Sequence, residues 1–114
     1  IRKKAAVSGR GLAAVITTVA DKKDAKRLAN LMLDVRLAAC VQVMPIQSFY
    51  CWRGQREEAS EFILLAKTRA ALAGRLMQFI ARNHAYETPE IIALPIAKSA
   101  PAYLQWVRRE TAPR

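Results

Sequence analysis

The order of apolar segments predicts an α+β fold of the ferredoxin-like βαββαβ class, in which two helices cover one face of an antiparallel sheet and a further helix ends the chain. Three observations predict this fold. Strand-length apolar segments alternate with two amphipathic segments. The two middle strand segments flank a polar turn with no helix between them. The length of 114 residues fits one domain, which we expect at residues 11–114 after a frayed arm at residues 1–10.

The first half of the chain supplies a strand, a helix and one arm of a hairpin. Residues 12–19 are apolar and β-branched, so they predict a buried strand. Asp21 can cap a helix over residues 22–36, whose apolar residues recur at three- and four-residue spacing. Residues 38–52 predict the second strand. Pro45 cannot donate a ladder hydrogen bond, so we expect it at an edge or a bulge.

The second half completes the hairpin and adds a helix, a strand and a last helix. Residues 53–56 predict the turn and residues 61–68 the returning strand, which is apolar on both alternating sets. A helix over residues 69–83 and a strand over residues 90–96 follow, and Pro101 opens the C-terminal helix. Because a sheet that is apolar on both faces needs cover on both, we expect oligomerisation through the sheet.

The net charge of +10, from 19 Lys+Arg against 9 Asp+Glu, suggests a nucleic-acid or acidic-membrane partner. However, the cations are spread over the N-terminal arm, the outer helix faces and the C-terminus, so we expect no nucleic acid and no membrane among the partners. The uncharged stretch 37–52 is too short for a bilayer span. The N-terminus lacks the apolar core of a signal peptide, but it begins at Ile, so a preceding targeting segment stays open.

The cysteines and the missing catalytic patterns narrow the class of protein further. Cys40 and Cys51 share one predicted strand and would be about 36 Å apart, so we expect free thiols in a reducing compartment, the cytoplasm. One histidine, no nucleophile elbow and no glycine-rich phosphate loop give no pattern of an enzyme. The same residues cannot supply the close ligand pairs of an intrachain zinc site.

Two short segments and one isolated cation are candidates for binding. Segment 83–90 can bind a metal, titrate near neutrality, or only cap a helix and close a turn; it contains His84, Tyr86, Glu87 and Glu90. Tyr50 and Trp52 share a strand face, as do aromatic pairs that merely stabilise hairpins. Lys67 ends an apolar strand, where it either reaches solvent or holds an anion or a carboxylate.

The motifs run in order between residues 12 and 110: Leu37-Ala38-Ala39-Cys40-Val41, Pro45-Ile46-x-Ser48-x-Tyr50-x-Trp52-x-Gly54, Glu61, Lys67-Thr68, His84-x-Tyr86-Glu87-x-Pro89-Glu90-Ile91 and Tyr103-Leu104-x-Trp106. Together they resemble the CutA family of divalent-cation tolerance proteins. The resemblance implies a homotrimer of ferredoxin-like subunits, no catalysis, and a link to tolerance of copper and other divalent metals.

The resemblance also implies a metal site, and its ligands are only partly present. Thr17 and Asn83 stand where family members have a Cys and a second His, and neither suits copper. The remaining candidates imply weak binding of copper or another divalent metal, with no other cofactor, at a subunit boundary; they are His84, Cys40, Glu87 and Glu90.

Two alternatives stay open at this point. The first is a trimeric small-ligand regulator resembling the P-II signalling proteins, with a pocket for an anionic or polar ligand; its residues would be Trp52, Glu61, Lys67, Tyr86 and His84. The second is an RNA-binding module of the RRM type, which has this topology. The chain lacks the RRM aromatic signature, so this alternative is the weakest.

Overall fold

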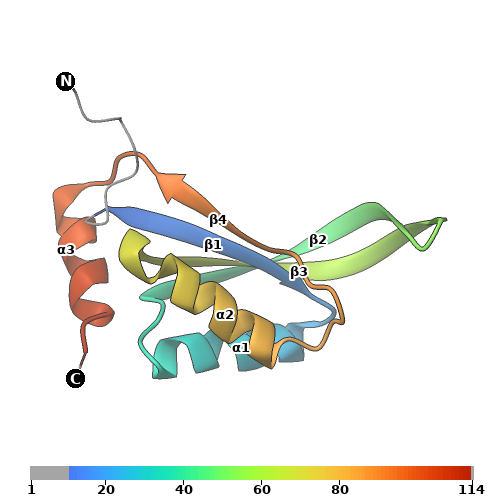
Figure 1. The fold of residues 1–114 in the computed structure, drawn as a ribbon, viewed down its shortest axis with the longest axis horizontal. Coiled ribbons are helices and arrows are strands. Elements are labelled where there is room, and N and C mark those ends of the chain that lie inside the picture. The colour runs from blue at the N-terminus through green and yellow to red at the C-terminus, as the bar shows by residue number, and fades with distance from the viewer. Residues whose placement is uncertain (1–10, 114) are drawn as a thin grey trace.

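The computed structural model describes residues 11–113 and confirms the ferredoxin-like class (Figure 1). The predicted arm at residues 1–10 lies outside the described residues. The elements follow in the order β1 (Leu12–Val19), α1 (Lys22–Asp34), β2 (Cys40–Trp52), β3 (Gln55–Arg69), a 3₁₀ turn (Ala70–Leu72), α2 (Ala73–Asn83), β4 (Ile91–Ile96) and α3 (Pro101–Glu110). The strands form one antiparallel sheet in the order β2-β3-β1-β4.

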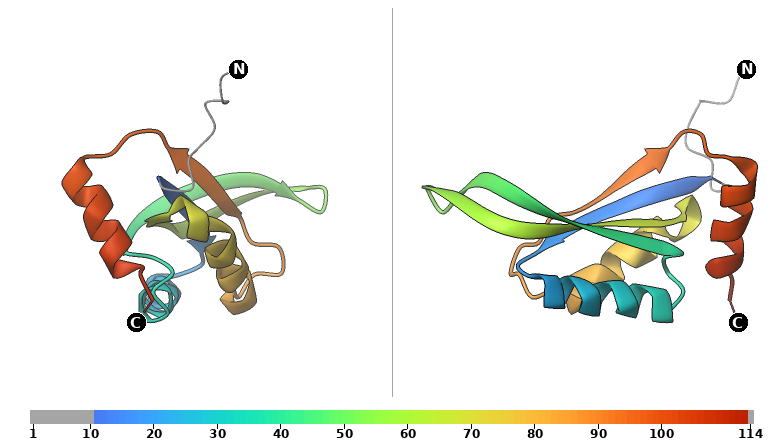
Figure 2. Two further views of the ribbon diagram at one scale, coloured as in Figure 1. Left: turned by 60° about the vertical axis from the view of Figure 1, so that its left-hand side comes forward. Right: turned by 180° about the vertical axis from the view of Figure 1, so that it is seen from behind.

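Helices α1 and α2 lie side by side on one face of the sheet (Figures 1 and 2). The core between them contains alternate residues of β1 and β3 and the apolar stripes of both helices; its members include Val15, Val19, Leu64 and Ala66 from the sheet and Leu28, Met32, Leu76 and Ile80 from the helices. Strand periodicity of two and helix periodicity of 3.6 bring these residues to one layer.

Helix α1 starts as predicted and ends two residues early. The Asp21 carboxylate accepts a hydrogen bond of 2.8 Å from the Asp24 amide, which caps the first turn. The predicted end at residue 36 is wrong, because Arg36 has a φ of 58°, in the left-handed region that ends helices. The Arg36 guanidinium then donates to the carbonyls of Arg109 and Ala112, 2.6 Å away in each case, and ties this loop to α3.

The hairpin is longer than predicted. Strand β3 begins at Gln55 rather than at residue 61, and the predicted turn 53–56 shrinks to Arg53 and Gly54, whose φ values are 50° and 80°. Two consecutive positive φ values are typical of a two-residue I′ hairpin turn. Residues 55–60 lack an apolar pattern because they pair only with β2 and extend beyond the rest of the sheet, where they stay largely exposed (Figure 1).

Three other boundaries differ slightly. Strand β2 begins at Cys40, two residues later than the predicted start at residue 38. The predicted helix 69–83 is divided, because Arg69 still pairs in β3 and the α-helix begins only after the 3₁₀ turn. Strand β4 begins one residue later than predicted, at Ile91. Pro45 lies in β2, at the edge of the sheet and in unbroken register, so the predicted edge position is confirmed.

Within residues 11–113, the face of the sheet opposite α1 and α2, called the open face below, is covered only at one end. There α3 packs over the ends of strands, in a second cluster of Leu12, Ala39 and Val107 with Ile96, Leu104 and Trp106. Beyond α3, Met44, Ile92 and Leu94 are 54%, 44% and 47% exposed. The predicted two-sided apolar sheet is confirmed.

Candidate functional site

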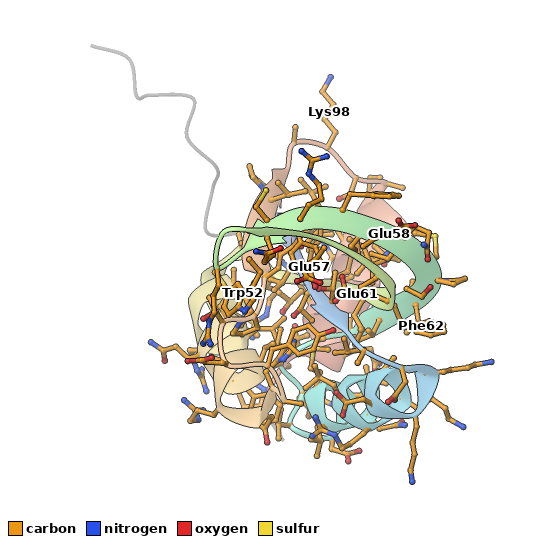
Figure 3. The ribbon with its side chains drawn as sticks, turned by 90° about the vertical axis from the view of Figure 1, so that its right-hand side faces the viewer. Trp52, Glu57, Glu58, Glu61, Phe62 and Lys98 are labelled. Atoms are coloured by element: carbon orange, nitrogen blue, oxygen red, sulfur yellow. The ribbon has the colours of Figure 1, made fainter. Side chains whose placement is uncertain are left out.

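A cavity of about 550 Å³ lies at the base of the projecting hairpin, where β3 continues past the end of β1. The hairpin forms one wall and the loop between α2 and β4 forms another. The lining residues are Thr18, Ser48, Phe49, Tyr50, Trp52, Glu61, Tyr86, Glu87, Thr88 and Glu90. In Figure 3, which views the molecule from the hairpin end, Trp52 and Glu61 lie on one side of the hairpin and Glu58 and Phe62 on the other.

His84 connects the α2–β4 loop to the sheet. Its Nε2 atom lies 2.9 Å from the Thr18 carbonyl and 3.1 Å from Thr17 Oγ1, and its Nδ1 atom accepts a bond of 3.1 Å from the Tyr86 amide. Because an amide N–H can only donate, Nδ1 is unprotonated and the ring proton is on Nε2, pointing at the carbonyl. The imidazole is therefore neutral. Its hydrogen bonds attach the α2–β4 loop to β1 and orient Tyr86.

This geometry makes His84 a poor metal ligand. A metal at Nδ1 would displace the Tyr86 amide, and a metal at Nε2 would displace the bond to Thr18. Leaving a half-buried polar group without a partner costs about 1–3 kcal/mol, which subtracts from any affinity for a metal. Of the alternatives for segment 83–90, the helix cap matches the structure: His84 is the C-cap of α2, and its ring bonds to β1.

Tyr86 and Glu61 form the polar centre of the cavity. The Tyr86 hydroxyl donates a hydrogen bond of 2.6 Å to the Glu61 carboxylate, and Glu61 is only 7% exposed. The rings of His84 and Tyr86 are in contact, with centroids 5.0 Å apart. Burial, followed by the hydrogen bond to Glu61 and its charge, raises the pKa of the Tyr86 phenol above its ordinary value of 10.0.

Replacing Tyr86 by Phe is expected to remove a phenol that loses its proton only at high pH. Because folding raises the Tyr86 pKa, its stabilising contribution is complete below pH 10.0 and is lost as the pH rises above that value. The measurement is a pH titration of tyrosinate absorbance at 295 nm. Compared with wild type, Tyr86→Phe should show a smaller rise in absorbance only at the most alkaline pH values. In Glu61→Gln the Tyr86 pKa should move back toward the ordinary value. An unchanged alkaline end in both variants would refute the Tyr86–Glu61 coupling.

An exposed ion pair spans from the hairpin turn to the α2–β4 loop. Arg53 Nη2 lies 3.1 Å from Glu87 Oε1, and the guanidinium lies 5.3 Å from the centre of the Trp52 ring. Both charged side chains are largely exposed, so the pair contributes little to stability. It shows that the aromatic and acidic groups at this end of the hairpin attract a cation.

The structure brings together three residues of the predicted pocket but leaves Lys67 and His84 out of the cavity lining. Trp52, Glu61 and Tyr86 line the cavity, whereas Lys67 lies about 20 Å away along β3 at roughly 3.3 Å per residue. The Lys67 amine donates to the Gln42 side-chain carbonyl. Three other wall residues, Thr18, Phe49 and Thr88, were not predicted, because their only signal in the sequence is proximity to the motifs.

The candidate metal ligands are likewise divided within one chain. Glu87 and Glu90 line the cavity, while Cys40 pairs opposite Lys67 at the other end of β2 and lies beside Tyr103, whose pKa is raised by burial and by Cys40. Within residues 11–113, no three His, Cys, Asp or Glu side chains gather in a way that could hold a metal ion. Cys40 and Cys51 are both free thiols, as predicted.

The fold and the site together define a ferredoxin-like α+β protein with a cavity of small-ligand size at the base of its hairpin. No helix within residues 11–113 has the length and apolar character that crossing a bilayer requires. Residues 13–110 match the family described as CutA1 divalent ion tolerance protein. The chain belongs to this family, whose members are non-enzymatic tolerance proteins.

Individual relatives agree with this membership. The chain is 39% identical over 98 residues to a divalent-cation tolerance protein CutA of Thermus thermophilus, covering 85% of this chain and 95% of that protein. It is 41% identical over 98 residues to a chloroplastic CutA protein of Arabidopsis thaliana, covering 85% of this chain and 54% of that protein. The chain spans little more than half the length of the mouse, Arabidopsis and human relatives that it matches.

The fold agrees with a solved relative as well. The structure of the periplasmic divalent cation tolerance protein CutA from Archaeoglobus fulgidus superimposes with a TM-score of 0.86 at 33% identity, covering 89% of this chain and 99% of that chain. The names of these relatives place them in different compartments, chloroplast and periplasm.

Proposed function

We propose that the chain, with a single domain over residues 11–114, forms a homotrimer that serves divalent-metal tolerance and binds copper weakly. Membership of the tolerance family supports the metal link. The observation that carries the assembly is the open face, where Met44, Ile92 and Leu94 leave apolar area in solvent that a second and third copy would cover.

Weak copper binding follows from the ligands that are available. Both nitrogens of the single histidine are already hydrogen-bonded, and Thr17, which contacts His84 at 3.1 Å, has a hydroxyl rather than a soft donor. Carboxylates of Glu87 and Glu90 stand at the cavity, and Cys40 of another copy is the remaining soft candidate at a subunit boundary.

Calorimetric titration with copper tests this proposal. We expect Glu90→Gln to weaken copper binding by about tenfold. His84→Ala should weaken it less, because a metal at either imidazole nitrogen must first displace a hydrogen bond. Glu58→Gln, which removes an equal charge from the other side of the hairpin, should leave the isotherm unchanged. Circular dichroism would first show that His84→Ala is folded. Isotherms that coincide for wild type and both ligand variants would remove the metal site from this proposal.

We also propose that the protein works in the cytoplasm, where its two free thiols stay reduced. Fractionation of cells that produce the protein, with detection in each fraction, checks this proposal. Recovery from a periplasmic or organellar fraction would contradict it, and relatives named for such compartments make the measurement informative.

The cavity favours a second candidate function, that of a small-ligand-binding regulator. Its volume of about 550 Å³ is within the range of small-molecule sites, and aromatic walls surround a buried polar centre. The Lys67 amine, expected to meet an anionic ligand there, lies elsewhere on β3. Any ligand must therefore suit a cavity without that cation.

A further inference from the structure

We propose that a second cavity, formed where the ends of α1 and α3 meet, binds a small anion that carries phosphate groups. The cavity has a volume of about 340 Å³, within the range of small-molecule sites. Its lining includes Arg36, Arg69, Arg75, Asp34 and Thr111, and it is called the arginine cavity below. This inference goes beyond the proposed function, because it depends neither on copper binding nor on the cavity at the base of the hairpin.

The arginine cavity lies away from the open face. Helix α1 lies on the opposite side of the sheet, and α3 extends past the sheet until its C-terminal end lies beside the end of α1 (Figures 1 and 2). None of the exposed apolar side chains Met44, Ile92 and Leu94 lines the cavity. Association of copies through the open face therefore leaves the arginine cavity accessible.

Two half-buried arginines of the cavity are held in place by the end of α3. Arg36 donates from Nε and Nη2 to the carbonyls of Ala112 and Arg109, 2.6 Å away in each case. Arg69 donates from Nε to Thr111 Oγ1 at 2.9 Å and from Nη2 to the Thr111 carbonyl at 2.8 Å. The Nη1 atom of each guanidinium makes no hydrogen bond within residues 11–113. These donors are preorganised, so an anion that binds them orders little that was free before.

The positive charge of the arginine cavity exceeds the negative charge around it. None of its three arginines forms an ion pair within residues 11–113, where the ion pairs are made by Arg27 and Arg53. The end of a helix carries only about half a negative charge, so α3 offsets only part of the charge of the two guanidiniums bonded to it. Arg75 adds a third guanidinium, which is exposed, and Asp34 is the only acidic side chain among the described lining residues. The cavity therefore attracts an anion.

The guanidinium groups favour phosphate among the anions. A planar guanidinium binds phosphate oxygens in pairs, with two parallel hydrogen bonds. A phosphate group also offers more oxygens and more negative charge than a carboxylate, so it can accept from more than one guanidinium at once. Guanidiniums from the end of α1, the end of β3 and the start of α2 surround the same small volume. A compact ligand with two linked phosphate groups matches this arrangement.

Calorimetric titration of pyrophosphate into the full-length protein tests the inference. In sodium chloride at physiological ionic strength we expect saturable binding, which Arg75→Gln should weaken by about tenfold. Arg82→Gln is the matched control, because Arg82 is also an exposed arginine of α2 but lies roughly 10 Å further along the helix and does not line the cavity. The control should leave the affinity nearly unchanged.

A gain of affinity supplies a second readout. Asp34→Asn removes the carboxylate that repels the anion, so it should strengthen pyrophosphate binding several-fold. A partly unfolded variant would not bind more tightly, so this result separates the site from an effect on folding. Pyrophosphate should also raise the melting temperature of the wild type more than that of Arg75→Gln.

Four outcomes would overturn the inference. The first is the absence of saturable pyrophosphate binding. The second is equal weakening by Arg75→Gln and Arg82→Gln, which would show only a general attraction to a basic protein. The third is equal binding of citrate, which has a similar charge but only carboxylates. The fourth is a loss of affinity in Leu94→Asp, on the open face, because it would place the anion between copies rather than in this cavity.

Discussion

Replacing Leu64 by Ala is expected to lower the free energy of unfolding by about 2–5 kcal/mol. Leu64 has no exposed surface and lies in the middle of β3, where it faces α1 and α2 in the core. Its neighbours in the sheet, Thr17 and Val43, are held by ladder hydrogen bonds, so the surroundings cannot collapse into the space left by the deleted methyl groups. Guanidinium denaturation at one fixed protein concentration measures the loss.

The matched control is Leu33→Ala. Leu33 lies on α1 and is 40% exposed, so the same deletion removes little buried area there, and Ala is a good helix former. We expect a loss below about 1 kcal/mol. Equal losses at positions 64 and 33 would mean that the core does not lie between the sheet and the two helices.

Replacing Leu94 by Asp is expected to convert the proposed trimer into monomers. Leu94 lies on the open face beside Ala14 of β1 and is 47% exposed in one chain. If copies associate through this face, the new carboxylate is buried against apolar side chains without a counter-charge, which costs several kcal/mol at each interface. Light scattering coupled to size-exclusion chromatography measures the mass directly.

Leu33→Asp serves as the control for this substitution, because it places the same charge at a comparably exposed leucine on the helical side of the molecule. We expect Leu33→Asp to keep the mass of three chains. A trimer that survives Leu94→Asp would show that the open face is not the interface, and a trimer lost in both variants would point to a general loss of folding.

Much of the fold could be predicted because each element has a local signal. The β-branched segment of β1, the Asp21 cap of α1 and Pro101 at the start of α3 all act within a few residues. The start of β3 had no such signal, because residues 55–60 gain their strand conformation only from pairing with β2. Edge strands exposed on both faces need no apolar alternation, so their sequence looks like a loop.

The sequence predicted the types of residue at the candidate site, but only some of the particular residues that line it. The aromatic and acidic motif positions Trp52, Glu61 and Tyr86 do meet at one cavity. Lys67 does not meet them, although it shares β3 with Glu61 and even the same parity along that strand. Distance along the strand, together with the point at which β1 ends, decides which of these residues borders the cavity, and neither follows from spacing in the sequence.

By itself, the sequence determined the family, the order of the elements and the two-sided apolar character of the sheet, because motifs and periodicity are local properties of the chain. Only the tertiary structure decided that both ring nitrogens of His84 are hydrogen-bonded, and that the residues lining the cavity at the base of the hairpin are acidic rather than basic. Hydrogen-bond partners and the charge of a cavity depend on which segments, distant in the sequence, lie together in the fold. Here the hairpin packs against the α2–β4 loop.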